Sequence, residues 1–315
     1  MHVDKSNDNY ILRSKIMSNA KPLISIGIPT YNRANGYLKQ AIQASIKQNY
    51  PEIEIIVSDN CSNDNTQEVV RGFEDPRIRY IRQSENIGMN NNFNYCVQQA
   101  RGAYFLLLPD DDLIDEDFID ICMKNANFDL DIGIIRTGTR LINEKNGVIA
   151  EYPNRVVGLS TLDFFLGWFT GKTAPYMCST LFNTRRLKEI GGFHSKHNLF
   201  QDVGAEVKLA AHYGRVDIYD VKASFRKHSE ELTHSAKVSG WCEDSLELLD
   251  LICELMPENK ELIIARGMPF LAYICYNRTR AVKSTVKRTL AILTVFKKFH
   301  YKYYPTRQQL THKII

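Results

Sequence analysis

The sequence has no long hydrophobic run, since none of its apolar stretches approaches the roughly 20 residues that a membrane-spanning helix needs. Segment 1–21 is polar and lacks the hydrophobic core of an export signal, so we expect a cytoplasmic chain. None of the seven cysteines stands in a paired metal-binding spacing, which suits a reducing compartment and predicts no disulfides. A glycine-rich dinucleotide fingerprint is also missing after the first predicted strand, which argues against a nicotinamide-dependent enzyme.

Acidic residues are absent from segment 277–315, which carries ten Lys or Arg although the whole chain has a net charge of only +4. Apolar and basic residues there fall on roughly opposite helical faces: Val282, Val286, Leu290, Leu293 and Phe296 against Arg280, Lys283, Lys287 and Lys298. Such a helix can lie on an anionic membrane surface or hold a partner, or it can pack on its own domain with a solvated basic face. No nucleic-acid reading motif accompanies it, so we expect no nucleic-acid partner.

Strand and helix patterns alternate through the first 112 residues. The β-rich runs lie at 23–28, 53–57, 78–81 and 103–108, and the helical patterns at 38–46, 66–73 and 90–100. This alternation predicts an α/β fold with a single doubly wound, mostly parallel sheet flanked by helices. In such a sheet ligands bind beyond the carboxyl ends of the strands, where Pro29, Asp59 and Asp110 stand.

Three consecutive aspartates, Asp110, Asp111 and Asp112, follow the last of these runs. Carboxylates that are packed together repel one another, and a divalent cation is the usual agent that turns this repulsion into attraction. The cluster therefore predicts a site for Mn²⁺ or Mg²⁺. The alternative is a solvated acidic loop that caps a helix beginning near Asp115.

Two further polar clusters follow predicted strands. In segment 58–66, Asp59 stands at the strand end, where it can accept hydrogen bonds from a nucleotide base, while Asp64 suits the capping of the next helix. Segment 85–94 is unusually rich in amides and includes Asn86 and Gly88. For any single asparagine in that segment, a helix N-cap on a polar surface is the favoured interpretation.

These motifs, in this order, resemble those of the family 2 glycosyltransferases. The similar strings are ISIGIPTYNR at 24–33, IVSDN at 56–60, NIG at 86–88 and the three aspartates, and the resemblance covers about residues 22–235. It implies a GT-A fold, a nucleotide-sugar donor, a divalent cation and an inverting transfer. The Gln-x-x-Arg-Trp motif and the membrane helices of processive polysaccharide synthases are absent, which favours transfer of a single sugar over polymerisation.

The resemblance also implies roles for individual residues. The nucleotide-binding residues would be Pro29, Thr30, Tyr31, Arg33, Asp59, Asn86, Gly88, Asp110 and Arg226. Asp111 is the best-matched metal ligand, because the first aspartate of the family's metal motif falls on Pro109 here. Asp112 and His228 are the other metal candidates.

An inverting transfer needs a base that removes the proton of the acceptor hydroxyl. The family's acidic pair corresponds here to Gln201 and Asp202, so Asp202 is the predicted catalytic base, with plain helix capping as the alternative. The string Gly191-Gly192-Phe193 fits the acceptor-side loop of the family. For three nearby aromatic residues we favour core packing over sugar stacking: Phe164, Phe165 and Trp168.

We therefore predict a polar tail at 1–21, a nucleotide-sugar-binding half at 22–115, an acceptor-binding half of the same domain at 116–235 and a basic helical extension at 236–315. The predicted reaction moves one sugar, most readily from a UDP-sugar, to a saccharide or lipid-linked saccharide, with 277–315 as a contact to the inner face of a membrane. A nucleotidyltransferase stays open as an alternative, although such enzymes favour a Gly- and Lys/Arg-rich first loop and this chain offers only Arg33. A catalytically inactive sugar-nucleotide-binding protein also stays open because of Gln201 and Pro109.

Overall fold

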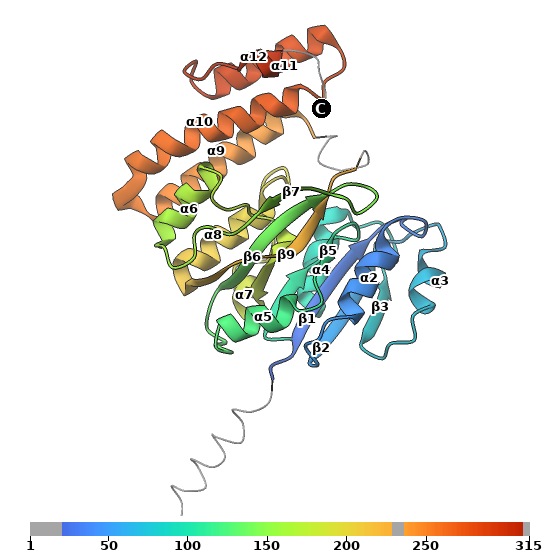
Figure 1. Cartoon of the computed structure of the whole chain (residues 1–315). Coiled ribbons are helices and arrows are strands. Elements are labelled where there is room, and N and C mark those ends of the chain that lie inside the picture. The colour runs from blue at the N-terminus through green and yellow to red at the C-terminus, as the bar shows by residue number, and fades with distance from the viewer. Residues whose placement is uncertain (1–20, 229–235, 311–315) are drawn as a thin grey trace, which may run out of the picture.

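Residues 21–228 and 236–310 are described in the computed structural model, and within them nine strands form one sheet (Figure 1). The strand order is β3-β2-β1-β4-β8-β6-β9-β5, and β7 pairs with β6 beside this path. The strands are β1 Ile24–Thr30, β2 Ile53–Asp59, β3 Ile78–Arg82, β4 Tyr104–Leu107, β5 Leu113–Ile114, β6 Ile134–Ile142, β7 Val148–Tyr152, β8 Thr180–Asn183 and β9 Arg215–Arg226.

The first half of the sheet is parallel, which confirms the fold class predicted from the alternating pattern. β1 pairs in parallel with both β2 and β4, and β2 pairs in parallel with β3. The connecting helices are α2 Leu38–Ile46, α3 Thr66–Arg71 and α4 Met89–Gln99. The register sets Thr30 opposite Asp59, so the carboxyl ends of β1 and β2 are level at one edge of the sheet.

Each face of the sheet carries its own hydrophobic core, because successive residues of a strand point to opposite sides. In β4, Phe105 and Leu107 belong to one core, while Tyr104 and Leu106 belong to the other. Gly27 on β1 lets α4 approach closely, since a Cβ atom there would overlap the ring of Phe105 and the Cβ of Cys96. The central strands β1, β2 and β4 are therefore buried on both sides, whereas β7 is largely exposed.

The second half of the sheet mixes strand directions. β8 is antiparallel to both β4 and β6, whereas β6 and β9 are parallel. The two-residue strand β5 pairs antiparallel with Ala223 and Ser224 of β9, so the chain segment that follows the aspartates is tied to the end of β9. The helices of this half are α5 Phe118–Asn125, α6 Thr161–Phe169, the 3₁₀ helix η1 Met177–Ser179, α7 Thr184–Glu189 and α8 Gln201–Tyr213.

A helical layer follows β9 and packs on α6 and α8 (Figure 1). It consists of α9 Val238–Leu255, the 3₁₀ helix η3 Pro257–Asn259, α10 Lys260–Thr279, α11 Thr285–Lys298 and α12 Arg307–Leu310. Trp241, Leu249 and Leu271 are buried there and continue the core that covers one face of the sheet. Among the described helices, none combines the length and the apolar character that crossing a bilayer requires.

Candidate active site

A pocket of about 590 Å³ opens at the carboxyl ends of β1, β2 and β4. Its walls also include the beginning of α8 and the end of β9. Of the residues predicted for the site, the lining contains Pro29, Thr30, Tyr31, Arg33, Asn86, Asp110, Asp111, Asp112, Asp202 and Arg226. Asp59, Gly88 and His228 do not line it. Fold topology thus brings most of the predicted site together from distant parts of the chain.

The turn after β1 is bound to the first aspartate of the cluster. The hydroxyl of Thr30 donates a hydrogen bond of 2.6 Å to Oδ2 of Asp110, and Nε of Arg33 lies 3.9 Å from Oδ1 of the same carboxylate. Burial, together with the nearby charge of Asp111, raises the pKa of Asp110 to about 7. The pocket therefore holds carboxylates that are costly to ionise without a compensating positive charge.

Asp111 lines the pocket and contacts His228, which lies just behind the lining, although 117 positions separate the two residues in the sequence. Oδ2 of Asp111 lies 2.8 Å from Nε2 of His228, and the ring of Tyr37 packs 5.6 Å from the imidazole. One carboxylate oxygen and one imidazole nitrogen are donors that suit Mn²⁺, and a cation that binds a diphosphate needs only one or two ligands from the protein. These two residues therefore fit a divalent cation.

Asp112 differs from its neighbours because its side chain is turned into the protein. It is buried, and Oδ1 accepts a hydrogen bond of 2.9 Å from the backbone N–H of Arg226. Burial and the charge of Asp111 raise the pKa of Asp112 well above its usual range. Within residues 21–228 and 236–310, no three or more His, Cys, Asp or Glu side chains gather at one metal-sized site. The predicted set of Asp111, Asp112 and His228 is thus only partly assembled.

Arg226 stands in the pocket wall, but its guanidinium is buried and engaged by the protein itself. Nε donates to the carbonyl oxygen of Asp111 at 2.7 Å, and Nη1 donates to Oδ1 of Asn146 at 2.6 Å. Nη2 donates to Oε1 of Gln40 at 3.2 Å. These bonds attach the acidic turn to α2 and to the loop before β7, so Arg226 supports the turn from behind.

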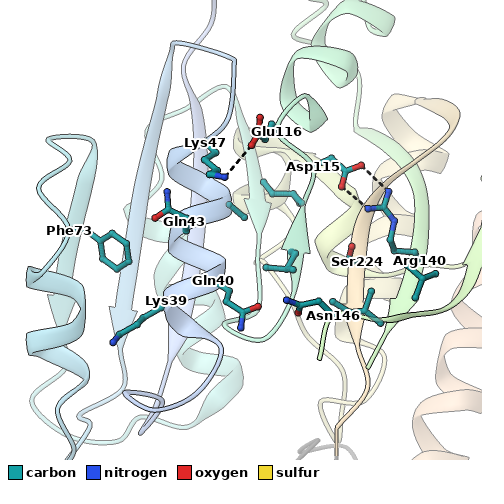
Figure 2. Close-up of a pocket in the computed structure, with 15 residues that line it drawn as sticks. Lys39, Gln40, Gln43, Lys47, Phe73, Asp115, Glu116, Arg140, Asn146 and Ser224 are labelled. Atoms are coloured by element: carbon teal, nitrogen blue, oxygen red, sulfur yellow. Dashed lines mark hydrogen bonds and ion pairs between the residues drawn. The ribbon is translucent and has the colours of Figure 1, made fainter. Parts of the chain in front are cut away.

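Gln40 and Asn146 also line a second, open groove of about 840 Å³ between α2 and the strands β5, β6 and β9 (Figure 2). Figure 2 shows Lys47 paired with Glu116, and the carboxylate of Asp115 facing Arg140 with two contacts. Because these opposite charges are paired, the groove has no dominant charge of one sign. The groove is connected to the active-site pocket through Gln40 and Asn146, whose side-chain amides bind Arg226.

Asp59, predicted to contact a nucleotide base, is completely buried beneath the pocket. Oδ1 accepts a hydrogen bond of 2.8 Å from the backbone N–H of Ser62, and Oδ2 accepts one of 2.5 Å from the hydroxyl of Tyr80. Its neighbour Asn60 lines the pocket instead. A direct contact between Asp59 and a base stays a prediction, and Asp59 visibly fixes the turn that carries Asn60.

Amide groups build the wall between β2 and α4. Nδ2 of Asn60 donates to Oδ1 of Asn86 at 2.9 Å, and Oδ1 of Asn60 accepts from the backbone N–H of Ile87 at 2.9 Å. Gly88, with φ of +85°, is the N-cap residue of α4 and adopts a conformation that favours glycine. The amide-rich segment is therefore a connected network that shapes the pocket rather than a row of independent caps.

Asp202 lies in the first turn of α8 and lines the pocket. The N-cap residue of α8 is Phe200, whose side chain makes no capping hydrogen bond, and Asp202 stands two positions further along the helix. Burial raises the pKa of Asp202 to about 6, while the backbone N–H groups of Asp202 and Val203 oppose this shift. A carboxylate with such a pKa is largely ionised at neutral pH and is basic enough to accept a proton.

A buried ionic network supports Asp202 from below. Glu206, one turn further along α8, has Oε2 at 3.1 Å from Nε of Arg136 and accepts a hydrogen bond of 2.9 Å from Thr180. Burial raises the pKa of Glu206 to about 7, although the positive charge of Arg136 opposes this. The neighbouring Gln201 is also buried, and its Oε1 atom has no hydrogen-bond partner among the described residues.

The aromatic residues near the site belong to the core, as we predicted from the sequence. Phe164 and Phe165 are buried, and Trp168 packs edge-on against Phe200 and Phe270 with ring centroids 6.0 and 5.2 Å away. The Gly191-Gly192 turn has positive φ at both residues, and its following residue, Phe193, is held by Asn94 through two backbone hydrogen bonds.

Several residues that line the pocket were not predicted: Asn32, Asn60, Met89, Asn92, Phe93, Tyr176, Met177, Asn198 and Leu199. Asn60 and Asn92 fall within the polar clusters visible in the sequence. Tyr176 and Met177 lie at the start of η1, before β8, and Asn198 and Leu199 precede α8; neither segment carries a recognised sequence motif. Their place in the pocket depends on the packing of the second half of the domain.

Comparison with known proteins agrees with these features. The profile of Glycosyl transferase family 2 matches residues 25–181. An uncharacterized glycosyltransferase of Rickettsia conorii is 32% identical over 265 residues, which are 79% of this chain and 41% of that protein. One of Rickettsia typhi is 30% identical over 220 residues, covering 68% and 67%. A GalNAc(5)-diNAcBac-PP-undecaprenol beta-1,3-glucosyltransferase of Campylobacter jejuni is 30% identical over 176 residues, covering 53% and 55%.

Solved structures show the same fold at low sequence identity. TarS 1-349 of S. aureus has a TM-score of 0.68 at 15% identity and covers 88% of this chain and 80% of that one. The same protein in complex with UDP-GlcNAc has a TM-score of 0.58 at 15% identity, covering 88% and 89%. The mannosyltransferase PcManGT from Pyrobaculum calidifontis, in complex with GDP-Man and Mn²⁺, has a TM-score of 0.56 at 17% identity, covering 93% and 89%.

The sequence and structural comparisons agree with each other. The chain spans about 41% of the length of the R. conorii relative, and about two thirds of the R. typhi relative. The fold similarity confirms the α/β fold of GT-A type that the sequence predicted. Together with the family profile, these relatives show that the chain belongs to the family 2 glycosyltransferases.

Proposed function

We propose that the protein transfers a single hexosyl group from a nucleotide sugar to a saccharide or lipid-linked saccharide, with inversion and with the help of a divalent cation. The observation that carries this proposal is the meeting, in one pocket, of the turn after β1, the acidic turn at 110–112 and Asp202. A nucleotide-sugar donor needs polar groups for the nucleotide, a charge-compensating group for the diphosphate and a base for the acceptor. All three kinds of group face this pocket.

We assign the donor to a UDP-sugar, on the resemblance of the first strands to the family motif. The neighbours bind different bases, since TarS was solved with UDP-GlcNAc and PcManGT with GDP-Man. In our assignment Thr30, Tyr31 and Asn86 hold the nucleotide, and Asn60 positions the wall beside it. Tyr31 is 41% exposed at the pocket, which leaves its ring free to contact a flat base.

We assign the cation to Asp111 and His228, and PcManGT provides a precedent because it was solved with Mn²⁺. A divalent cation bound there supplies positive charge that compensates the negative charge of the departing nucleoside diphosphate. Arg226 and Thr30 contribute by fixing the acidic turn, through its backbone and through Asp110 respectively. The protein thus presents the donor in a defined position before the acceptor arrives.

Asp202 is the proposed base. Its carboxylate accepts the proton of the acceptor hydroxyl while that oxygen attacks the anomeric carbon of the donor sugar, and the bond to the diphosphate breaks on the opposite face. Attack opposite to the leaving group inverts the anomeric configuration. Glu206 and Arg136 lie behind Asp202 and hold the first turns of α8 in place.

We further propose a cytoplasmic location at the inner face of a membrane, with a lipid-linked saccharide as acceptor. The C. jejuni relative supports this acceptor class, since its name includes an undecaprenol-linked saccharide. We keep the proposed division of the chain into the polar tail 1–21, the donor half 22–115, the acceptor half 116–235 and the extension 236–315. Within these parts, residues 1–20, 229–235 and 311–315 lie outside the described structure.

The decisive experiment compares wild type with Asp202→Asn in a transfer assay with a UDP-sugar and Mn²⁺. We expect turnover to fall by about three orders of magnitude while donor affinity stays within a factor of about two. Asp131→Asn is the matched control, because Asp131 is an aspartate with a side chain 85% exposed outside the pocket. Absence of turnover in the wild type would favour a catalytically inactive binding protein. Transfer of a nucleotidyl group would favour a nucleotidyltransferase.

A thermal-shift panel of UDP, GDP, TDP and CDP, each with and without Mn²⁺, tests the donor assignment separately. A ligand that binds only the native state raises the apparent melting temperature. We expect the largest shift for UDP with the cation. An equal shift for all four nucleotides would contradict selection of the base by the pocket.

A further inference from the structure

Helix α11 exposes three aliphatic side chains along one line. Val286 is 71% exposed, Leu290 is 58% exposed and Leu293 is 55% exposed. They stand at positions i, i+4 and i+7, so they form a continuous stripe on one helical face. Moving such a stripe from water into an apolar phase lowers the free energy. A stripe that stays exposed to water brings no such stabilisation.

The stripe is not the surface by which α11 packs on the protein. Arg288, Val295 and Phe299 are buried, and they lie on a different face of the helix, toward α9 and α10. Figure 1 shows α11 and α12 at the outer end of the helical layer, with α9 and α10 between them and the rest of the domain. The helix is therefore anchored by one apolar face and presents a second one outward.

Basic residues border the outward stripe. Lys283, Lys287 and Lys297 are exposed, and within the described chain no carboxylate forms an ion pair with them. Segment 262–310 contains no Asp or Glu. Tyr304, 75% exposed, lies against Phe296 at the end of the helix and adds an amphipathic ring of the kind found at membrane surfaces.

We propose that the outward face of α11, formed by Val286, Leu290 and Leu293 with Lys283, Lys287 and Lys297, docks on an anionic lipid surface. The aliphatic side chains enter the boundary between headgroups and acyl chains, and the lysines pair with the negative charge of the lipids. The combination of apolar stripe, cationic border and absence of carboxylates favours anionic lipid over a protein partner. Only the purpose of this docking depends on the proposed function: it would bring the pocket close to a lipid-linked acceptor.

Vesicle flotation of the full chain tests this docking. We expect binding to vesicles of phosphatidylglycerol and phosphatidylcholine, little binding to phosphatidylcholine alone, and weaker binding as salt rises. Leu290→Ser with Leu293→Ser should weaken binding at least tenfold. Replacing the three lysines by glutamine should weaken it on the order of a hundredfold at low salt, from roughly fivefold for each lysine near an anionic surface.

Ile149→Ser is the matched control, because Ile149 is an aliphatic residue 54% exposed on β7, away from the basic segment. Point variants are preferable to truncation after Asn277, since truncation would uncover the core that Val295 and Phe299 complete. Thermal melts of each variant confirm that the fold is retained. Donor binding by the variants should equal that of wild type, so a failure of docking is distinguishable from a failure of the proposed transfer.

Two outcomes would overturn the proposal. One is equal binding of wild type and the α11 variants to anionic vesicles. The other is a wild-type dimer in solution that the leucine variants convert to a monomer without any vesicle binding, which would identify the stripe as a contact between copies of the chain.

Discussion

Asp202 in the pocket wall is expected to make the catalytic activity depend on pH. Burial raises the pKa of its carboxyl to about 6, and only the ionised form can accept a proton. We expect kcat/KM to be level above about pH 7 and to fall about tenfold per pH unit below the pKa. A pH–rate profile from pH 5 to 8 with a UDP-sugar measures this. A flat profile down to pH 5 would contradict the assignment of Asp202 as base.

Gln40 acts on the pocket through Arg226 without lining it. Its Oε1 atom accepts a hydrogen bond from Nη2 of Arg226, and Arg226 in turn holds the carbonyl of Asp111. Loss of a hydrogen bond to a charged group costs about 1.5–3 kcal/mol, and the lower end of that range, transmitted through Arg226 to the acidic turn, should weaken Mn²⁺-dependent UDP binding by about tenfold in Gln40→Leu. Calorimetric titration measures this affinity.

Gln43→Leu is the control for that change, because Gln43 lines the same groove from the same helix (Figure 2). Among the described residues, the hydrogen bonds of the Arg226 guanidinium go to Asp111, Asn143, Asn146 and Gln40, not to Gln43. We expect it to leave the affinity unchanged. Equal effects of the two substitutions would mean that groove shape, not support of Arg226, controls the pocket.

Removal of the His228 side chain tests its proposed role as a ligand of the cation. We expect His228→Ala to abolish the part of the UDP thermal shift that depends on Mn²⁺ and to keep the part seen with a chelator, because the nucleotide-binding side chains remain. His212→Ala, an exposed histidine on α8, is the control. A Mn²⁺-dependent shift that survives in His228→Ala would exclude His228 from the cation site.

At the scale of elements, Asn92 attaches α4 to strand β2. Oδ1 of Asn92 accepts from the hydroxyl of Ser58 at 2.7 Å, and Nδ2 donates to the carbonyl of Ser58 at 2.9 Å. Asn92 is buried, so Asn92→Ala leaves the carbonyl and hydroxyl of Ser58 without these partners. We expect a loss of about 2–3 kcal/mol in the free energy of unfolding, measured by urea denaturation.

Asn91→Ala on the same helix is the matched control. Asn91 is exposed, and among the residues that the structure describes its side chain donates only to the backbone carbonyl of Ile87. We expect a change of less than about 0.5 kcal/mol. A similar loss for both substitutions would show that helix propensity, and not the bond to Ser58, determines the effect.

The elements of the first half were predictable because their patterns are local. The apolar run at 53–57 and the helical spacing at 38–46 predict a strand and a helix from neighbouring residues alone, and the structure has β2 at Ile53–Asp59 and α2 at Leu38–Ile46. The two-residue strand β5 was not predicted, because Leu113 and Ile114 are too short a segment to indicate pairing with Ala223 and Ser224. That pairing depends on the path of the chain through more than one hundred intervening positions.

For the whole molecule, buried carboxyl groups predict a stability that depends on pH. The pKa of Asp202 is raised to about 6 and that of Glu206 to about 7, so the folded state favours their protonated forms. Their stabilising contribution is complete below the unfolded pKa values of about 4 and is lost as pH rises through 6 and 7. Stability should therefore fall between pH 5 and pH 8 in the absence of ligand.

Because Asp202 is only partly buried in the pocket wall, we expect it to contribute about 1–2 kcal/mol of that fall. Urea denaturation at pH 5 and pH 8 measures the difference, and Asp202→Asn should reduce it by this amount. A variant whose pH dependence equals that of wild type would place the responsible groups elsewhere.

The parallel first half, the order of the polar clusters and the residues of the family motifs can be read from local spacing and composition. Which of those residues share a pocket depends on the packing of distant segments, which brings His228 to Asp111, turns Asp112 toward the backbone of Arg226 and buries Asp59 beside Tyr80. The same packing also decides that the stripe of Val286, Leu290 and Leu293 faces outward. A periodic pattern shows that a helix has an apolar face, but only packing selects the face that meets the core.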